Sequence, residues 1–391
     1  MPSRKGSPPP ARSGLLVVLG GVGLGLLAGT PAGRAQPEDV PQFGGPSSVG
    51  GELNEDGKVF TSAPRSTLLQ PLVRPWFNLK ETLIDSTGLS VGFDATTLWQ
   101  GAHSSSPSLD AAGGIVRAFG NWTLLGRGTA DTGSLVYKVE NRHALNTAIA
   151  PQDLGFASGY VGLTASPYSQ TNWSLTNLYW SQKLLDGRLS LSVGQVDATD
   201  YVNVYGMVNP WTSFSNLAFQ TGATIPAPSQ GLGAAGGMMV SKQINVVAGI
   251  ADANGDPTNP ASTFNSFFND AETFKHLEIG WTPSQQRLYL DNVPITAWQV
   301  DKRREAGTPD GWGLAFSAST FIQDRWMPFL RLGYANDGGA LWDRSVSVGL
   351  GYYLQEHREL AGFAVNWSRP TPADFGPGLR DQITMELFYR F

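Results

Sequence analysis

The sequence has no cysteine, few charged residues and, beyond its first thirty-five residues, no long uninterrupted apolar segment. The absence of cysteine excludes disulfide-stapled folds and thiolate metal sites. Charged residues make up 15% of the chain, whereas an average soluble domain has about 25%. No later segment offers about 18 consecutive apolar residues, so membrane-spanning helices are not expected. The low charge and the 47 glycines also argue against an ordinary helical enzyme.

The N-terminus has the pattern of a secretory signal peptide. Arg4, Lys5 and Arg12 precede an apolar run, Leu15–Ala28, and small residues follow to Ala35. This order of basic, apolar and small residues predicts a signal peptide over residues 1–35. Its removal would change the formal charge from −5 to −9, because the segment holds four basic and no acidic residues. An acidic chain is not expected to bind nucleic acid.

The rest of the chain divides into two parts. Residues 36–74 mix Pro, Gly, Ser and acidic residues without a period, which predicts a flexible leader in the periplasm or inside a pore. We expect the main domain over residues 75–391. It opens with a short amphipathic stretch, Phe77–Ser86, and then shows the two-residue period of β-strands.

That period separates apolar from small polar residues in segments 89–96, 189–194 and 345–352. In the first of them, Leu89, Val91 and Phe93 share one face, and Asp94 lies on the other. Alternation alone leaves two interpretations open. The apolar face either packs inside a soluble sandwich or faces lipid around a water-filled barrel.

Other features favour the barrel. Most of the twelve Trp lie near the ends of candidate strands, as the aromatic girdles of membrane barrels require. In the last segment Met385, Leu387, Tyr389 and Phe391 alternate with Thr384, Glu386, Phe388 and Arg390. At about 20 residues per strand and loop, the length predicts an all-β transmembrane antiparallel β-barrel of roughly 14–18 strands.

Charged residues follow the polar face of these strands. Lys138, Glu140 and Arg142 share one face, opposite Tyr137 and Val139. Placing Arg or Lys on the lipid face would cost about 2–4 kcal/mol each at the midplane. The residues predicted to line the pore and contact the solute are Asp94, Lys138, Glu140, Arg142, Arg331, Glu386 and Arg390.

A pore lined by both signs of charge suits a neutral polyhydroxylated solute. Arginine and carboxylate groups form directional hydrogen bonds with hydroxyls, and aromatic faces accept the apolar side of a sugar ring. A second interpretation of Lys138, Glu140 and Arg142 is a solvated ladder of cross-strand ion pairs that only holds the wall together.

Several segments resemble the carbohydrate-selective porins of the OprB family. They are 133–143, 193–206, 211–234, 310–319, 328–339, 345–353, 360–370 and 380–391, in the same order along the chain. The resemblance implies a 16-stranded outer-membrane barrel that passes sugars by diffusion, with arginines and acids near its constriction. It also implies that Lys138, Glu140 and Arg142 lie on a strand that presents charges to the pore. Similar proteins usually continue past the FYR segment with another hairpin, so the strand number stays open.

We therefore expect a passive channel for mono- and oligosaccharides in the bacterial outer membrane, without cofactor or metal. Phe391 resembles the C-terminal signal read by the barrel-assembly machinery, and the barrel is expected to be a monomer or a homotrimer. The alternatives are a general non-selective porin, a barrel enzyme using Ser104–Ser106 and His103, and a soluble secreted sandwich that binds glycans.

Three further patterns carry little weight. The four histidines are scattered without metal-binding spacing. Segment 252–259 resembles the start of a calcium loop but lacks the glutamate at its twelfth position. The glycine-rich segment 231–237 has no nucleotide-loop context and is predicted to be a loop between strands.

Overall fold

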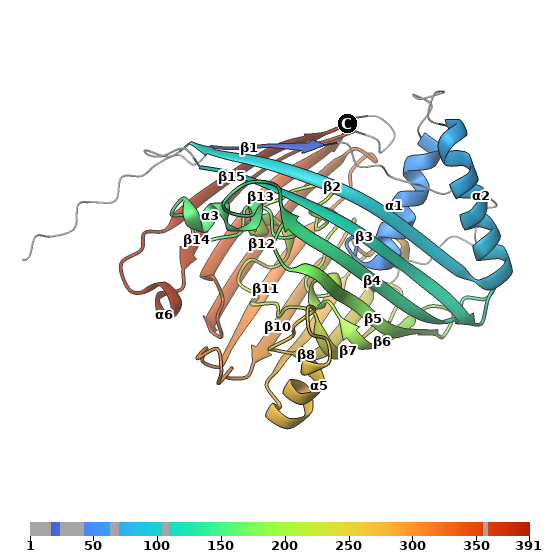
Figure 1. The fold of residues 1–391 in the computed structure, drawn as a ribbon. Coiled ribbons are helices and arrows are strands. Elements are labelled where there is room, and N and C mark those ends of the chain that lie inside the picture. Colours follow the sequence, from blue (N-terminus) through green and yellow to red (C-terminus); the bar gives the residue numbers. More distant parts are fainter. Residues whose placement is uncertain (1–16, 24–42, 63–69, 104–108, 355–358) are drawn as a thin grey trace, which may run out of the picture.

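One large antiparallel sheet forms the body of the protein (Figure 1). The computed structural model describes residues 17–23, 43–62, 70–103, 109–354 and 359–391. Each strand is hydrogen-bonded to its neighbours in sequence, in the order β1 to β15. The strands are β1 Val17–Gly23, β2 Leu89–His103, β3 Leu109–Leu125, β4 Gly133–Ala144, β5 Asn172–Leu184, β6 Leu189–Val196, β7 Gly231–Met239, β8 Ile244–Asp252, β9 Thr273–Trp281, β10 Val293–Val300, β11 Gly311–Ser319, β12 Trp326–Asp337, β13 Trp342–Tyr353, β14 Leu360–Pro370 and β15 Gln382–Arg390.

The strand number lies within the expected range but differs from the sixteen that the resemblance implied. Fifteen strands form the sheet in the described part of the chain. The first of them, β1, lies inside the expected signal peptide and pairs with β2 across residues 97–103. Most of that signal peptide falls outside the described residues. Without it, β2 to β15 form a fourteen-stranded meander.

The two longer helices of the described chain lie between β1 and β2, and four one-turn helices lie in later connections. They are α1 Val49–Ser62, α2 Gln70–Thr87, and the one-turn helices α3 Leu154–Ala157, α4 Leu217–Gln220, α5 Ser262–Asn265 and α6 Pro372–Phe375. The amphipathic stretch Phe77–Ser86 lies within α2, as expected. Helix α1 was not expected, because its segment belongs to the leader predicted to be flexible. In the described ranges no helix is both long and apolar enough to cross a membrane.

The two faces of the sheet differ sharply in polarity. On β2, Phe93 and Trp99 are 46% and 49% exposed, while Asp94 and Gln100, the residues that directly follow them, are each 2% exposed. On β13, Val348 is 55% exposed and Ser347 is 1% exposed. We call the face that carries Asp94 and Ser347 the inner face. Because the apolar residues point outward, the soluble sandwich with a buried apolar face is wrong.

The glycine-rich segment 231–237 forms most of β7, so its assignment to a loop is wrong. Its glycines allow close packing within the sheet. A Cβ atom placed on Gly237 would lie 2.2 Å from Cγ of Phe43, and one on Gly233 would lie 2.7 Å from the carbonyl oxygen of Ile250. Local composition suggested a loop, but the neighbours that require small residues come from distant parts of the chain.

Long connections fill the interior of the sheet. We call residues 197–230, between β6 and β7, the inner segment. Its Tyr205 and Phe214 pack on Phe329 of β12, with ring centroids 5.1 and 5.7 Å apart respectively. Residues 145–171, between β4 and β5, also reach the inner face, where the hydroxyl of Thr164 donates to Gln100 at 3.1 Å. The buried core therefore lies inside the curled sheet.

Candidate functional site

Three charged residues lie side by side on the inner face of β2, β3 and β4. Antiparallel pairing places Asp94 opposite Arg117 and Arg117 opposite Glu140. All three are at most 4% exposed. We call Asp94, Arg117 and Glu140 the charge row. It arises because each residue has the inward parity of its own strand and the pairing register aligns them.

Arg117 is the centre of this row. Its Nε donates to Oδ1 of Asp94 at 2.8 Å, and its Nη2 donates to Oδ2 at 2.5 Å. Its third contact is with helix α1, where Nη1 donates to Oε1 of Glu52 at 2.5 Å. The ring of Trp211, from the inner segment, lies 4.2 Å from Cζ of Arg117. A guanidinium held in this fork geometry is strongly oriented.

Two further cations adjoin the charge row on β4. Nζ of Lys138 lies 3.8 Å from Oε2 of Glu52. Nη2 of Arg142 lies 2.5 Å from Oε2 of Glu140. Three of the predicted pore residues, Lys138, Glu140 and Arg142, therefore do share one face, and they lie next to Asp94. Among these three residues, Arg142 pairs with Glu140 on the same strand and Lys138 approaches Glu52 of helix α1.

Asp200 joins the inner segment to the same region. Its Oδ2 accepts from Nδ2 of Asn177 at 3.1 Å, and its carbonyl accepts from the amide of Gly45 at 2.6 Å. Burial raises the pKa of Asp200 well above its usual value, and nearby Asp197 raises it further, while Lys138 acts in the opposite direction. Burial therefore makes this carboxyl harder to ionise than an exposed aspartate.

Arg331 lies on β12, away from the charge row. Its Nη1 donates to the carbonyl of Gln220, and its Nη2 donates to the carbonyl of Asn203, both at 2.8 Å. The ring of Tyr205 lies 4.4 Å from Cζ of Arg331. All three partners belong to the inner segment, so Arg331 fastens this segment to the wall.

Glu386, on β15, makes a similar attachment. Its Oε1 accepts from the amide of Ser215 at 2.7 Å, and its Oε2 accepts from the amide of Asn216 at 3.0 Å. Arg390 lies four residues further along the same strand and is half-buried. The structure thus places the predicted residues in two groups, one on β2 to β4 and one on β12 and β15.

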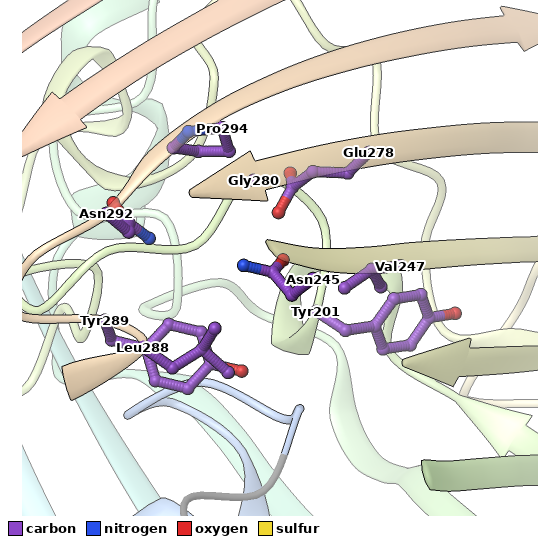
Figure 2. A pocket seen from close by; sticks show the side chains of 9 residues that line it. All are labelled: Tyr201, Asn245, Val247, Glu278, Gly280, Leu288, Tyr289, Asn292 and Pro294. Atoms are coloured by element: carbon purple, nitrogen blue, oxygen red, sulfur yellow. The ribbon is translucent and has the colours of Figure 1, made fainter. Parts of the chain in front are cut away.

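A small polar cavity lies beside the inner segment (Figure 2). Figure 2 shows Glu278, Asn245 and Asn292 pointing toward one space that Tyr201 and Tyr289 also border. Glu278 is anchored there, because its Oε2 accepts from the hydroxyl of Thr296 at 2.6 Å and from the amide of Asn203 at 3.0 Å. In the described ranges no three His, Asp or Glu side chains are grouped to hold a metal ion.

A family model described as the carbohydrate-selective porin, OprB family, matches residues 127–384, well over half of the chain. The chain belongs to the OprB family. Membership of this family indicates a passive carbohydrate channel of the bacterial outer membrane rather than an enzyme.

One solved structure shows the same fold as this OprB-family porin. The high-pH structure of Pseudomonas putida OprB matches with a TM-score of 0.59 and 15% identity, over 80% of this chain and 87% of that chain. A triple mutant of the Rhodopseudomonas blastica porin matches with a TM-score of 0.41 and 10% identity, over 72% of this chain and 85% of that chain. No match was found among curated protein sequences.

Sequence reasoning missed three residues of this porin's charged site: Glu52, Arg117 and Trp211. Arg117 carries a usable signal, because it has the parity of Ile115 and Phe119 in a strand whose neighbour presents Asp94. Glu52 and Trp211 carry none, because they come from an unexpected helix and from a connection between strands. The suggested enzyme residues Ser104–Ser106 lie outside the described residues.

Proposed function

We propose that this OprB-family porin passes neutral mono- and oligosaccharides by diffusion, along a path bordered by the predicted charged residues. The path would include Asp94, Lys138, Glu140, Arg142, Arg331, Glu386 and Arg390. The observation that carries the proposal is the balanced charge of the site on β2 to β4. There Glu52, Asp94 and Glu140 face Arg117, Lys138 and Arg142 at close range.

A balanced site gives little preference for ions of one sign and still offers oriented hydrogen-bonding groups. Carboxylates accept from sugar hydroxyls, and arginine and lysine donate to them. Trp211, packed on Arg117, adds an aromatic face of the kind that sugar rings contact. These groups favour a polyhydroxylated neutral solute over a simple anion or cation.

The test is the conductance of the purified protein in a planar lipid bilayer with increasing concentrations of glucose and maltooligosaccharides. We expect an ohmic conductance that sugars reduce in a saturable way. Equal permeation of sugars and of unrelated solutes of the same size, without saturable reduction, would instead identify a general non-selective porin.

We also propose that the last strand is read by the barrel-assembly machinery. Leu387, on the outer side of β15, is 78% exposed, and Phe391, directly after that strand, is 95% exposed. Substituting Phe391→Ser should lower the amount of folded protein in the outer membrane, measured by heat-modifiable gel migration, while Tyr352→Ser on β13 should have a smaller effect. Equal assembly of wild type and Phe391→Ser would contradict this.

A further inference from the structure

Helix α1 supplies a carboxylate to the inner wall at a point where the wall itself has an excess of cations. On β2, β3 and β4 the wall presents three cationic groups, Arg117, Lys138 and Arg142, against two carboxylates, Asp94 and Glu140. The third carboxylate, Glu52, comes from α1 and is 6% exposed. Without it, Lys138 would have no carboxylate within ion-pair distance in the described part of the chain, although Asp200 and Glu140 still attract it from further away.

The wall residues leave Nη1 of Arg117 available to the carboxylate of Glu52. Asp94 occupies Nε and Nη2 of Arg117, while Nη1 points to Glu52. Lys138 lies on the other side of the same carboxylate, 3.8 Å from its second oxygen. The two cations therefore bracket the two oxygens of a single carboxylate, a geometry suited to binding any carboxylate placed there.

Glu52 is held unevenly. Its Oε1 accepts the strong hydrogen bond from Arg117, but its buried Oε2 has no hydrogen-bond partner in the described part of the chain. Apart from this, the start of α1 is held by Val49, which packs on Phe119 and Val136. A buried oxygen that keeps only a long ion pair is incompletely satisfied, so a ligand that reached both cations closely would compete well with it.

We propose that Arg117 and Lys138 form a binding site for the carboxylate of an acidic sugar, and that Glu52 occupies this site as an internal substitute. The inference rests on the proposed sugar channel and adds a second substrate class to it. The ring of Trp211 lies 4.2 Å from Cζ of Arg117, and its side chain is only partly buried. It offers an apolar surface for the pyranose ring of the same ligand.

The experiment compares block of single-channel conductance by glucose and by glucuronate, which differ only in the carboxylate at C6. Wild type and Glu52→Ala are measured in planar bilayers at the same salt concentration. We expect Glu52→Ala to lower the half-blocking concentration of glucuronate roughly tenfold, the effect of one charge-assisted hydrogen bond. The half-blocking concentration of glucose should change less than about twofold, because glucose has no carboxylate that could pair with Arg117 and Lys138.

Three further variants make the test specific. In Glu52→Ala combined with Lys138→Gln the gain for glucuronate should disappear, because the second cation of the site is gone. Glu55→Gln removes a carboxylate from the same helix, three residues further on, and should leave the ratio of glucuronate to glucose block at the wild-type value. If Glu52→Ala yields no folded channel, Glu52→Gln, which keeps the side-chain shape, should show a smaller gain in the same direction.

The outcomes separate the two proposals. Absence of glucose block in the wild type would overturn the neutral-sugar channel, whereas the ratio of glucuronate to glucose block between variants reads the carboxylate site alone. An unchanged ratio in Glu52→Ala and Glu52→Gln overturns the site, and so does an equal gain in Glu55→Gln. A gain that survives Lys138→Gln overturns the assignment of Lys138.

Discussion

Individual charged residues on the inner face of this porin connect separate parts of the chain. Arg331 is the clearest example, because its guanidinium donates to carbonyls of Asn203 and Gln220 that lie in the inner segment. It is 4% exposed. A buried carbonyl that loses its donor costs about 1–3 kcal/mol, so this side chain sets the position of the inner segment.

Substituting Arg331→Ala should therefore loosen the inner segment. We expect a higher single-channel conductance and weaker block by glucose, with a loss of about 2–5 kcal/mol in folding free energy for the broken buried contacts. Arg325→Ala removes an arginine from an exposed turn next to the same strand and serves as control. Conductance and sugar block equal to the control would show that Arg331 does not position the segment.

Asp301 provides a pH-dependent test of local stability. Burial alone would raise the pKa of this carboxyl, but hydrogen bonds from Lys275, Gln299 and Thr273 outweigh it and lower the pKa below its usual value. A carboxyl with a lowered folded-state pKa stabilises the fold above its unfolded-state pKa, near 4, and loses that contribution as the pH falls through the folded-state value.

Substituting Asp301→Asn should accordingly lower the thermal midpoint in detergent at pH 7, with a difference from wild type that shrinks as the pH is lowered below about 4. Asp310→Asn, on an exposed stretch of the same connection, is the control. A difference that stays constant between pH 7 and pH 3, or grows, would contradict the assignment.

At this scale the sequence predicted which residues face inward but not what they contact. The sequence predicted the inward direction of Asp94, Lys138, Glu140 and Arg331, because successive side chains of a strand point to opposite faces. Their partners were not, because Glu52, Trp211 and Asn203 lie in segments without that period. Contacts between a regular strand and an irregular connection depend on packing over long sequence separations.

Among the elements, the segment that precedes α1 packs against β7 where Phe43 meets Gly237. Phe43 packs on Met239, Val247 and Leu288. A Cβ atom on Gly237 would lie 2.2 Å from the Phe43 ring, so even alanine requires the aromatic side chain to move. This contact helps to hold the segment that leads into α1.

Substituting Gly237→Ala should expel Phe43 and expose residues 43–62 to protease. We expect cleavage of this segment to be several-fold faster than in wild type, with the barrel strands still protected. The control is Gly236→Ala, the next residue of β7, where a Cβ atom would lie 2.9 Å from the flexible end of Leu191. Equal cleavage of both variants and wild type would show that the contact does not hold the segment.

The strands were the most predictable elements, and α1 and β7 the least. Segments 89–96, 189–194 and 345–352 form strands, because their polar and apolar residues alternate and so fall on opposite faces of the sheet. Helix α1 was missed because its sequence holds three glycines, which are poor helix formers, among Pro-, Gly- and Ser-rich neighbours. For β7, seven residues of mostly glycine and alanine suggested a loop. Their small size is instead explained by tight packing against neighbouring parts of the chain.

For the molecule as a whole, the central claim is that a curled antiparallel sheet turns its apolar face to lipid and its polar face to a sugar-conducting interior. The outer face carries large exposed apolar residues on strands from β2 to β15, among them Phe93, Val193, Val348 and Leu387. The overall architecture was predictable because this alternation recurs along the whole domain. The number of strands was not, because it depends on how the ends of the sheet meet.

The most direct test uses two neighbouring positions of β6 in a chain that has no cysteine of its own. Val193 is 58% exposed on the outer face, and Ser192 lies on the inner face. Val193→Cys and Ser192→Cys are spin-labelled in lipid vesicles, and their collisions with oxygen and with a water-soluble nickel complex are compared. The label at 193 should collide mainly with oxygen and the label at 192 mainly with nickel. The reverse preference would contradict the orientation of the barrel and with it the sugar channel.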